Sequence, residues 1–254
     1  MYYVYVYGII NGPRRVRLAQ KGMGGQDVFN IAYGRISALV SIADKNRFEP
    51  NEKNVLTHEA VIEEMMNNNH AVLPVRFATV LNDKREIKEI LRKHYQEFVA
   101  NLKKVKGAVE LGVKVFWEAD KMKKKAEVVV NKRIKQVPML HRDAAVNRPR
   151  VAGSGSRYLL EKMKIYFLEE GLEQKAEKMA KAINQRLSRH VRDSRFKKLV
   201  TEGLALNASY LVPKENCQDF ENEVAKMQKE NKNLKFLFSG PWPPYNFIEV
   251  KVAQ

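Results

Sequence analysis

The sequence predicts an α+β protein of two domains, in which helices pack against mainly antiparallel sheets. Three observations lead to this fold class. Short segments alternate apolar and polar residues, as half-buried strands do, and longer segments space apolar residues three and four apart, as amphipathic helices do. The chain of 254 residues is also long enough for two domains that each bury a core. We place these domains at residues 1–118 and 119–254.

The first part of the chain predicts three strands and a helix. The strands are expected at residues 2–8, 28–33 and 35–42, and the helix at residues 51–67. His58 lies on the apolar side of that helix. It begins a zinc-protease pattern whose second histidine is replaced by Ile62, so we expect a core histidine with one hydrogen-bond partner.

A strand, a helix and a second strand complete the predicted N-terminal domain. They are expected at residues 72–81, 83–105 and 109–117. Asp83 and Glu86 give the helix a capping-box start, and Gly107 follows it as a C-terminal stop. In the strand at 72–81, Arg76 points away from the face that carries Phe77. This order fits helices on one face of a mainly antiparallel sheet.

The second half begins with two predicted helices, at about residues 119–136 and 156–192. Their apolar stripes predict a long helical hairpin with coiled-coil character. Between them lies a basic segment bracketed by prolines and ending in Gly-Ser-Gly, which is the best linker candidate in the chain. A strand at 204–212, a helix at 215–230 and strands at 234–239 and 246–252 are expected to follow.

The composition excludes several kinds of site and leaves one alternative function open. Cys217 is the only cysteine, which rules out an internal disulfide, and its place on an apolar helical face predicts a buried structural thiol. We find no nucleophile elbow, phosphate loop or metal-ligand cluster, so we expect no enzyme and no cofactor. A net charge of +17 keeps a basic nucleic-acid (RNA) binding protein as the alternative, although the RNA-recognition strand motif is absent.

Neither a membrane span nor a signal peptide is predicted. The longest apolar runs fall short of the ~20 residues that cross a bilayer. The N-terminus alternates like a strand and has no basic region or small-residue cleavage site. We therefore expect a cytoplasmic protein.

A proline-rich strap near the C-terminus has two interpretations. Three prolines fix an extended path from residue 241 to residue 244, which presents Trp242, Tyr245 and Phe247 at low cost in ordering entropy. The strap is either an aromatic plug over a core or a surface offered to a partner. As a plug, it is expected to fold back over the second domain with Trp242 and Phe247 partly buried, and the strand at 246–252 to complete that sheet.

Three stretches of the chain resemble the gas vesicle protein F/L family. The strap reads Gly-Pro-Trp-Pro-Pro-Tyr-Asn-Phe, which looks like the closing signature of that family. Residues 5–9 read Tyr-Val-Tyr-Gly-Ile, similar to its Tyr-x-Tyr-Gly-Ile start. Residues 72–80 read Val-Leu-Pro-Val-Arg-Phe-Ala-Thr-Val and resemble its Val-Leu-Pro-(Leu/Val)-Arg-Phe-Gly-Thr-Val block. The departure is Ala78, where the family often has glycine.

The resemblance implies a modified ferredoxin-like N-terminal domain and a role as a minor gas vesicle protein. Such proteins contact the small, hydrophobic main shell protein (GvpA type) and other accessory proteins, and help to assemble the vesicle wall or keep the shell protein from aggregating. The resemblance leaves F-type and L-type membership open. The candidate partner-binding residues lie in the matched stretches: Arg76, Phe77, Trp242, Tyr245 and Phe247.

Overall fold

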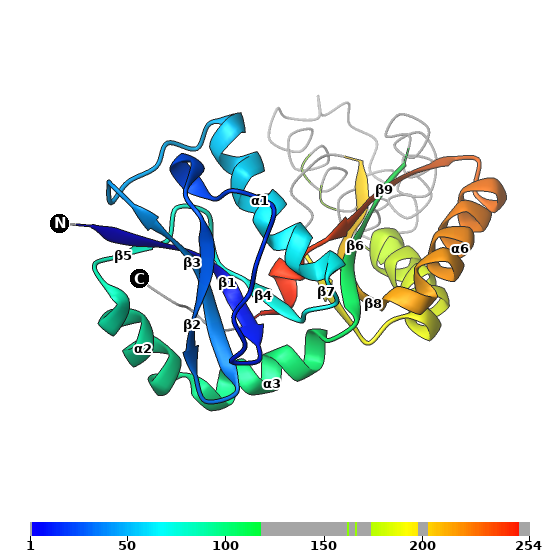
Figure 1. Cartoon of the computed structure of the whole chain (residues 1–254). Helices are drawn as coiled ribbons and strands as arrows, with labels where there is room; N and C mark the ends of the chain where they lie inside the picture. Colours follow the sequence, from blue (N-terminus) through cyan, green and yellow to red (C-terminus); the bar gives the residue numbers. More distant parts are fainter. Residues whose placement is uncertain (1, 118–161, 163–165, 167–173, 198–202, 249–254) are drawn as a thin grey trace, which may run out of the picture.

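The chain folds as a mixed helix and sheet protein with two separate antiparallel sheets (Figure 1). The computed structural model describes residues 2–117, 162, 166, 174–197 and 203–248. The α+β class predicted from the pattern is therefore confirmed. Most strands of both sheets are buried on both faces, and several elements differ from the prediction in place or extent.

The first sheet contains five strands, in the order β2-β3-β1-β4, with β5 also paired to β1. These strands are β1 (Tyr3–Asn11), β2 (Val28–Tyr33), β3 (Ile36–Ala43), β4 (Val72–Pro74) and β5 (Val80–Leu81). A short helix η1 (Met23–Gly25) lies between β1 and β2. All pairings are antiparallel. Strands β2 and β4 stand at the two ends of the main strand order and therefore form its edges.

Helices cover both faces of the first sheet, and the prediction of helices on one face is wrong. Helix α1 (Glu52–Asn67) packs on the face that carries Tyr5 and Tyr7. Helices α2 (Lys84–Lys93) and α3 (Tyr95–Val105) pack on the face that carries Val4 and Val6. The reason is that β1 is apolar on both sides, as strands buried between two layers are.

Two expected elements of this half are interrupted. The strand predicted at 72–81 is split into β4 and β5 by residues 75–79, where Ala78 adopts a left-handed φ of +62° that a strand cannot accommodate. The helix predicted at 83–105 is split at His94, whose φ of −106° and ψ of 19° lie outside the helical region. The capping prediction is confirmed, because the Asp83 carboxylate accepts hydrogen bonds from the amides of Arg85 and Glu86.

The second sheet has the order β7-β8-β6-β9. Its strands are β6 (Ala108–Trp117), β7 (Asp193–Phe196), β8 (Leu204–Pro213) and β9 (Leu234–Trp242). Strand β6 was grouped with the N-terminal domain by sequence, yet it is a central strand here. Gly107, with φ of +66°, ends α3 and turns the chain out of the first sheet. The division into two domains near residue 118 stays a prediction.

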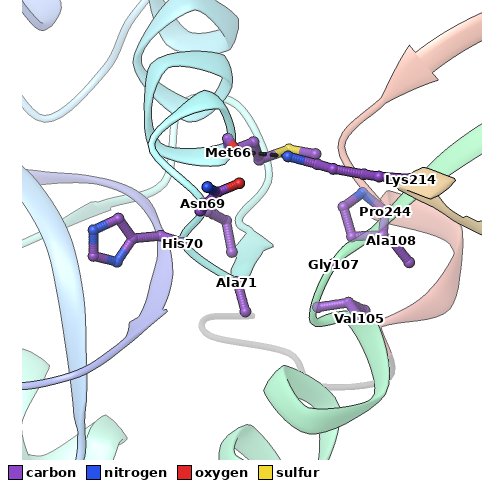
Figure 2. Close-up of a pocket in the computed structure, with 10 residues that line it drawn as sticks. Met66, Asn69, His70, Ala71, Val105, Gly107, Ala108, Lys214 and Pro244 are labelled. Carbon is purple, nitrogen blue, oxygen red and sulfur yellow. Dashed lines mark hydrogen bonds between the residues drawn. The ribbon is translucent and has the colours of Figure 1, made fainter.

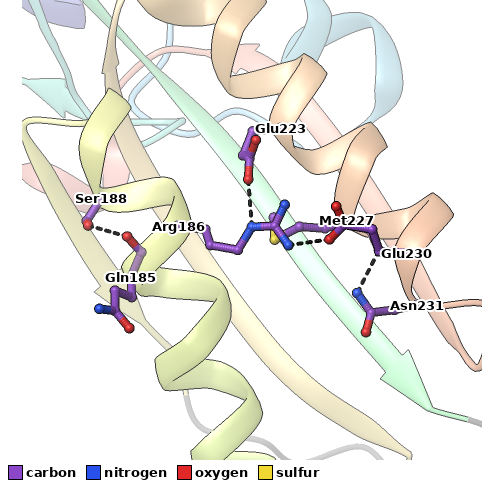
Figure 3. A network of polar contacts seen from close by, with 7 residues as sticks. All are labelled: Gln185, Arg186, Ser188, Glu223, Met227, Glu230 and Asn231. Atoms are coloured by element: carbon purple, nitrogen blue, oxygen red, sulfur yellow. Dashed lines mark hydrogen bonds and ion pairs between the residues drawn. The ribbon is translucent and has the colours of Figure 1, made fainter.

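Two helical segments cover one face of the second sheet. They are residues 174–187, followed by η4 (Ser188–His190), and α6 (Cys217–Glu230), which is preceded by η5 (Lys214–Asn216). Arg186 joins them, because its guanidinium contacts Glu223 at 2.6 Å and Glu230 at 2.5 Å (Figure 3). Cys217 is half-buried against this core, as a structural thiol would be.

Parts of the predicted second domain lie outside the described residues. These are the helix at 119–136, the linker candidate and most of the first half of the helix at 156–192. The last of these helices was expected to continue to residue 192. It ends earlier, and β7 follows, a strand that the sequence analysis missed.

The backbone of Ala78 yields a stability prediction. A non-glycine residue in the left-handed region has a steric cost of roughly 1–2 kcal/mol, which a glycine avoids. Glycine also raises the conformational entropy of the unfolded chain, and this offsets part of the gain in stability. Ala78→Gly should therefore raise the free energy of unfolding by about 0.5–1 kcal/mol in urea denaturation. Ala100→Gly, on the exposed side of α3, is the control and should lower it by about 1 kcal/mol. Equal losses in both variants would contradict the strain argument.

Candidate functional site

The C-terminal strap leaves the second sheet through a backbone that only glycine fits. Gly240 has φ of +117°, and a Cβ there would lie 2.8 Å from the carbonyl oxygen of Glu110. The Gly240–Pro241 peptide bond is cis. Strand β9 nevertheless continues to Trp242, which pairs with Glu110 across the ladder. The Trp242 side chain is 48% exposed, so it is less buried than the plug interpretation implies.

Beyond Trp242 the strap enters the junction between the two sheets (Figure 1). Pro243 and Pro244 are buried, and η6 (Tyr245–Phe247) follows them. The strand expected at 246–252 is contradicted at its start, because Asn246 and Phe247 belong to this short helix. Residues 249–252 lie outside the described part of the chain.

The strap straddles the free edge of the first sheet at β4. Pro244 and Val72 of β4 both line a cavity of about 30 Å³, which is enough for one water molecule. Figure 2 shows Pro244 at this cavity, opposite Ala71. Tyr245 packs with the core on the α1 side of the sheet. Phe247 is fully buried in the core on the α2 and α3 side. The expectation that the strap folds back over the second domain with Phe247 partly buried is therefore wrong, because Tyr245 and Phe247 enter the cores of the first sheet and Phe247 is fully buried there.

Two carboxylates fix the strap in this position. Glu110 of β6 is only 5% exposed, and its oxygens accept from the Asn246 amide at 2.9 Å and from the Asn246 side-chain Nδ2. The Tyr245 hydroxyl donates to Oε1 of Glu59 on α1 at 2.7 Å. Burial raises the pKa of Glu59, and the Tyr245 hydrogen bond opposes that shift. Burial and the neighbouring Glu59 carboxylate raise the Tyr245 pKa well above its ordinary value.

Cations from the second half cap two helices of the first half. Lys214 Nζ donates to the Met66 carbonyl oxygen at 2.8 Å, at the last turn of α1 (Figure 2). Arg192 donates to the carbonyl oxygens of Lys104 and Lys106 at the end of α3. Both cations meet the negative end of a helix dipole, where they also satisfy carbonyls that lack partners within the helix.

The other candidate stretch, the loop from Val75 to Thr79, is held by a buried network. The Ala78 amide donates to the Tyr5 hydroxyl at 2.9 Å, and that hydroxyl lies 3.0 Å from His58 Nδ1. His58 Nε2 lies 3.1 Å from the Val75 carbonyl oxygen. A neutral His58 that carries its proton on Nε2 satisfies all three contacts. Burial accordingly lowers the His58 pKa to about 4.

The structure brings some of the five candidate residues together and separates others. Phe77 and Tyr245 pack against the same core as His58, and the Phe77 ring lies edge-on to the imidazole. Phe247 lies on the opposite face of the first sheet. Arg76 and Trp242 are exposed. His58 is confirmed as a core residue, with two partners instead of the one expected.

Sequence reasoning missed the residues that hold the strap and those that cap helices of the first half from the second. Glu110 left one signal, a carboxylate inside a strand whose neighbours are apolar. Glu59, Lys214 and Arg192 left none, because each is an ordinary surface residue type on a helix or loop. Their partners are far away in the sequence, so only the tertiary fold identifies them.

Neither a metal-ligand cluster nor a membrane-spanning helix is found among the described residues. Within the described ranges, no three His, Cys, Asp or Glu side chains are grouped as metal ligands would be. Every helix described is too short or too polar to span a bilayer. The cavity beside the strap is too small for a substrate larger than water.

A family model and several curated proteins match nearly the whole chain. The model, described as gas vesicle synthesis protein GvpL/GvpF, matches residues 3–249. Gas vesicle protein F1 of Halobacterium salinarum is 24% identical over 98% of this chain and 94% of its own length. Gas vesicle protein F of Dolichospermum flosaquae is 25% identical over 97% and 98%. A gas vesicle protein L from Streptomyces is 27% identical over 76% and 68%.

Two crystal structures share the fold. GvpF from Anabaena superposes with a TM-score of 0.80 at 20% identity, covering 99% of this chain and all of its own. GvpF from Microcystis aeruginosa superposes with a TM-score of 0.77 at 19% identity, covering 98% and 99%. At these identities the likeness concerns the fold.

Truncating the two strap aromatics should have unequal effects on stability. Phe247 is fully buried, so Phe247→Ala should lower the free energy of unfolding by about 3–5 kcal/mol. Trp242 is half-exposed, so Trp242→Ala should lower it by at most about 1.5 kcal/mol. Urea denaturation of both variants measures the difference. Similar losses would mean that Trp242 is also a core residue in solution.

The neutral state of His58 predicts a loss of stability in acid. The folded pKa of about 4 lies below the ordinary value of 6.5, so the stabilisation is complete above pH 6.5 and is lost as the pH falls toward 4. Because the pKa differs between the folded and unfolded states, the free energy of unfolding should fall by about 3 kcal/mol across that interval. Denaturation at several pH values should show this slope in the parent chain and a smaller one in His58→Gln. An equal slope in the two proteins would rule out His58 as its source.

Proposed function

Because the chain belongs to the GvpL/GvpF family of gas vesicle synthesis proteins, we propose that it is a non-enzymatic accessory protein of gas vesicle assembly. It binds the hydrophobic main shell protein and holds it in a state from which the vesicle wall can grow. The observation that carries this proposal is the family match over residues 3–249, which includes both sheets and the strap.

We propose that the shell protein is contacted at the exposed end of β9. This strand is the edge of the second sheet, and Trp242 and Leu237 are 48% and 44% exposed on it. Phe236 and Phe238 alternate with Leu237 and pack into the core beneath the helices, so Leu237 faces the other way. Two exposed apolar side chains on a proline-stiffened edge strand support this assignment, because such an edge can receive an apolar segment at little entropic cost.

The five candidate residues then divide into two roles. Trp242 is a contact residue, and Arg76 lies in an exposed loop where it can contact a partner. Phe247 and Tyr245 position the strap, and Phe77 supports the loop that carries Arg76. In this proposal the strap is both plug and partner surface, since its buried end holds its exposed end in place.

The proposed action is stoichiometric binding in the cytoplasm, at the growing vesicle, without nucleotide or metal. Other accessory proteins of the vesicle are further candidate partners. The alternative of a nucleic-acid binder receives no support from the comparisons, whose named relatives are gas vesicle proteins.

The test is the solubility of the shell protein in the presence of this chain. Light scattering by diluted shell protein should fall as the chain is added and level off at a fixed ratio of the two proteins. Trp242→Ala should weaken this protection while the variant retains most of its stability, because half of the side chain is exposed.

Leu56→Ala is the matched control for that experiment. Leu56 is 59% exposed on α1. Helix α1 packs against the first sheet, whereas β9 belongs to the second. This variant should protect like the parent chain. Equal loss in both variants would contradict a specific contact at β9, and a requirement for ATP or a metal would contradict stoichiometric binding.

A further inference from the structure

A basic hollow lies at the end of α3, and none of its lining residues belongs to β9. Five residues line it: Ala100, Lys103, Lys104, Lys106 and Arg192. Its volume is about 550 Å³ and it is open to solvent. Four of the lining residues are cationic and none is acidic, so any ligand that enters meets positive charge from the end of α3 and from Arg192, which precedes β7.

Part of this charge has a structural explanation. Lys104 Nζ forms an ion pair with Asp193 at 2.8 Å and lies 5.9 Å from the centre of the Phe247 ring. Arg192 caps the end of α3. A helix C-terminus contributes only about half a negative charge, so Asp193 and the helix end together leave the hollow with a clear positive surplus.

The surplus is carried by Lys103 and Lys106. Both side chains are exposed, and neither has an ion pair with another described residue. Together with Lys104 they line the same open depression at the end of α3, so their positive charges lie within one small area of the surface. Such an arrangement attracts a ligand that carries several negative charges close together.

The hollow suits carboxylates better than nucleic acid. Single-stranded nucleic acid is bound by basic grooves that also offer exposed aromatic faces for base stacking. The aromatic ring at this place, Phe247, is fully buried beneath Lys104. The apolar part of the lining is Ala100, which gives room for a peptide side chain but no stacking surface.

We propose that this hollow is a docking site for an acidic segment of a partner protein, with two or more Asp or Glu side chains in contact with Lys103, Lys106 and Arg192. The site goes beyond the binding of a hydrophobic shell protein, because it recognises charge and is lined by other residues than the proposed contact at β9. It also gives a specific role to part of the net charge of +17.

The test uses a fluorescein-labelled peptide of about ten glutamates, titrated with the full chain and followed by fluorescence anisotropy. The double variant Lys103→Glu/Lys106→Glu should weaken binding by about tenfold or more at physiological ionic strength, because two attractive pairs become repulsive. Lys53→Glu/Lys88→Glu is the matched control, since both lysines are exposed on α1 and α2 and the change in net charge is the same. It should weaken binding by about threefold or less.

Three outcomes decide the proposal. Selective loss in the hollow variant supports it, provided that thermal melting shows that both variants are folded. Equal loss in the two variants would overturn it, because the overall charge would then suffice. Tighter binding of a single-stranded oligonucleotide of equal charge would also overturn it. If the hollow variant does not fold, Lys103→Gln/Lys106→Gln replaces it and should still weaken peptide binding more than Lys53→Gln/Lys88→Gln does.

Discussion

The buried carboxylate of Glu110 constrains the arrangement of the whole C-terminal part. A charge that is 5% exposed in the middle of an apolar strand is costly unless hydrogen bonds satisfy it, and the backbone and side-chain amides of Asn246 supply them. Forming these bonds brings η6 to the edge of the first sheet. Tyr245 and Phe247 then enter cores on its two faces. One polar requirement in the second sheet thus closes the exposed edge of the first.

The same junction explains how sequence-distant charges contribute to the fold. Lys214 and Arg192 come from the second half and cap α1 and α3 of the first. The strap, these caps and the Tyr245–Glu59 hydrogen bond all cross between the two sheets. Trp242 directly precedes the buried part of the strap, and Lys104 of the basic hollow lies over the Phe247 ring, so both proposed contact surfaces adjoin the region that the strap holds together.

Local pattern predicted the elements well and their partners poorly. The strands at 28–33 and 204–212 and the stop at Asn67 followed from alternation and turn residues, because these signals act between neighbours in the sequence. The break at His94 involves no proline or glycine and left no signal. The pairing of β6 with β9 in the second sheet, and the packing of Phe247 in the first core, depend on residues more than a hundred positions away. Of the candidate site, the pattern identified the strap but could not tell which of its aromatics is buried.

The most direct test of this account is a double-mutant cycle between Glu110 and Asn246. The free energies of unfolding of Glu110→Ala, Asn246→Ala and the double variant would be measured in urea at neutral pH. If the hydrogen bonds between Glu110 and Asn246 hold the strap in place, the losses in unfolding free energy from the two single changes should be strongly non-additive. We expect a coupling energy of about 1–3 kcal/mol. A coupling energy indistinguishable from zero would show that the strap is held without this carboxylate, which would contradict the account.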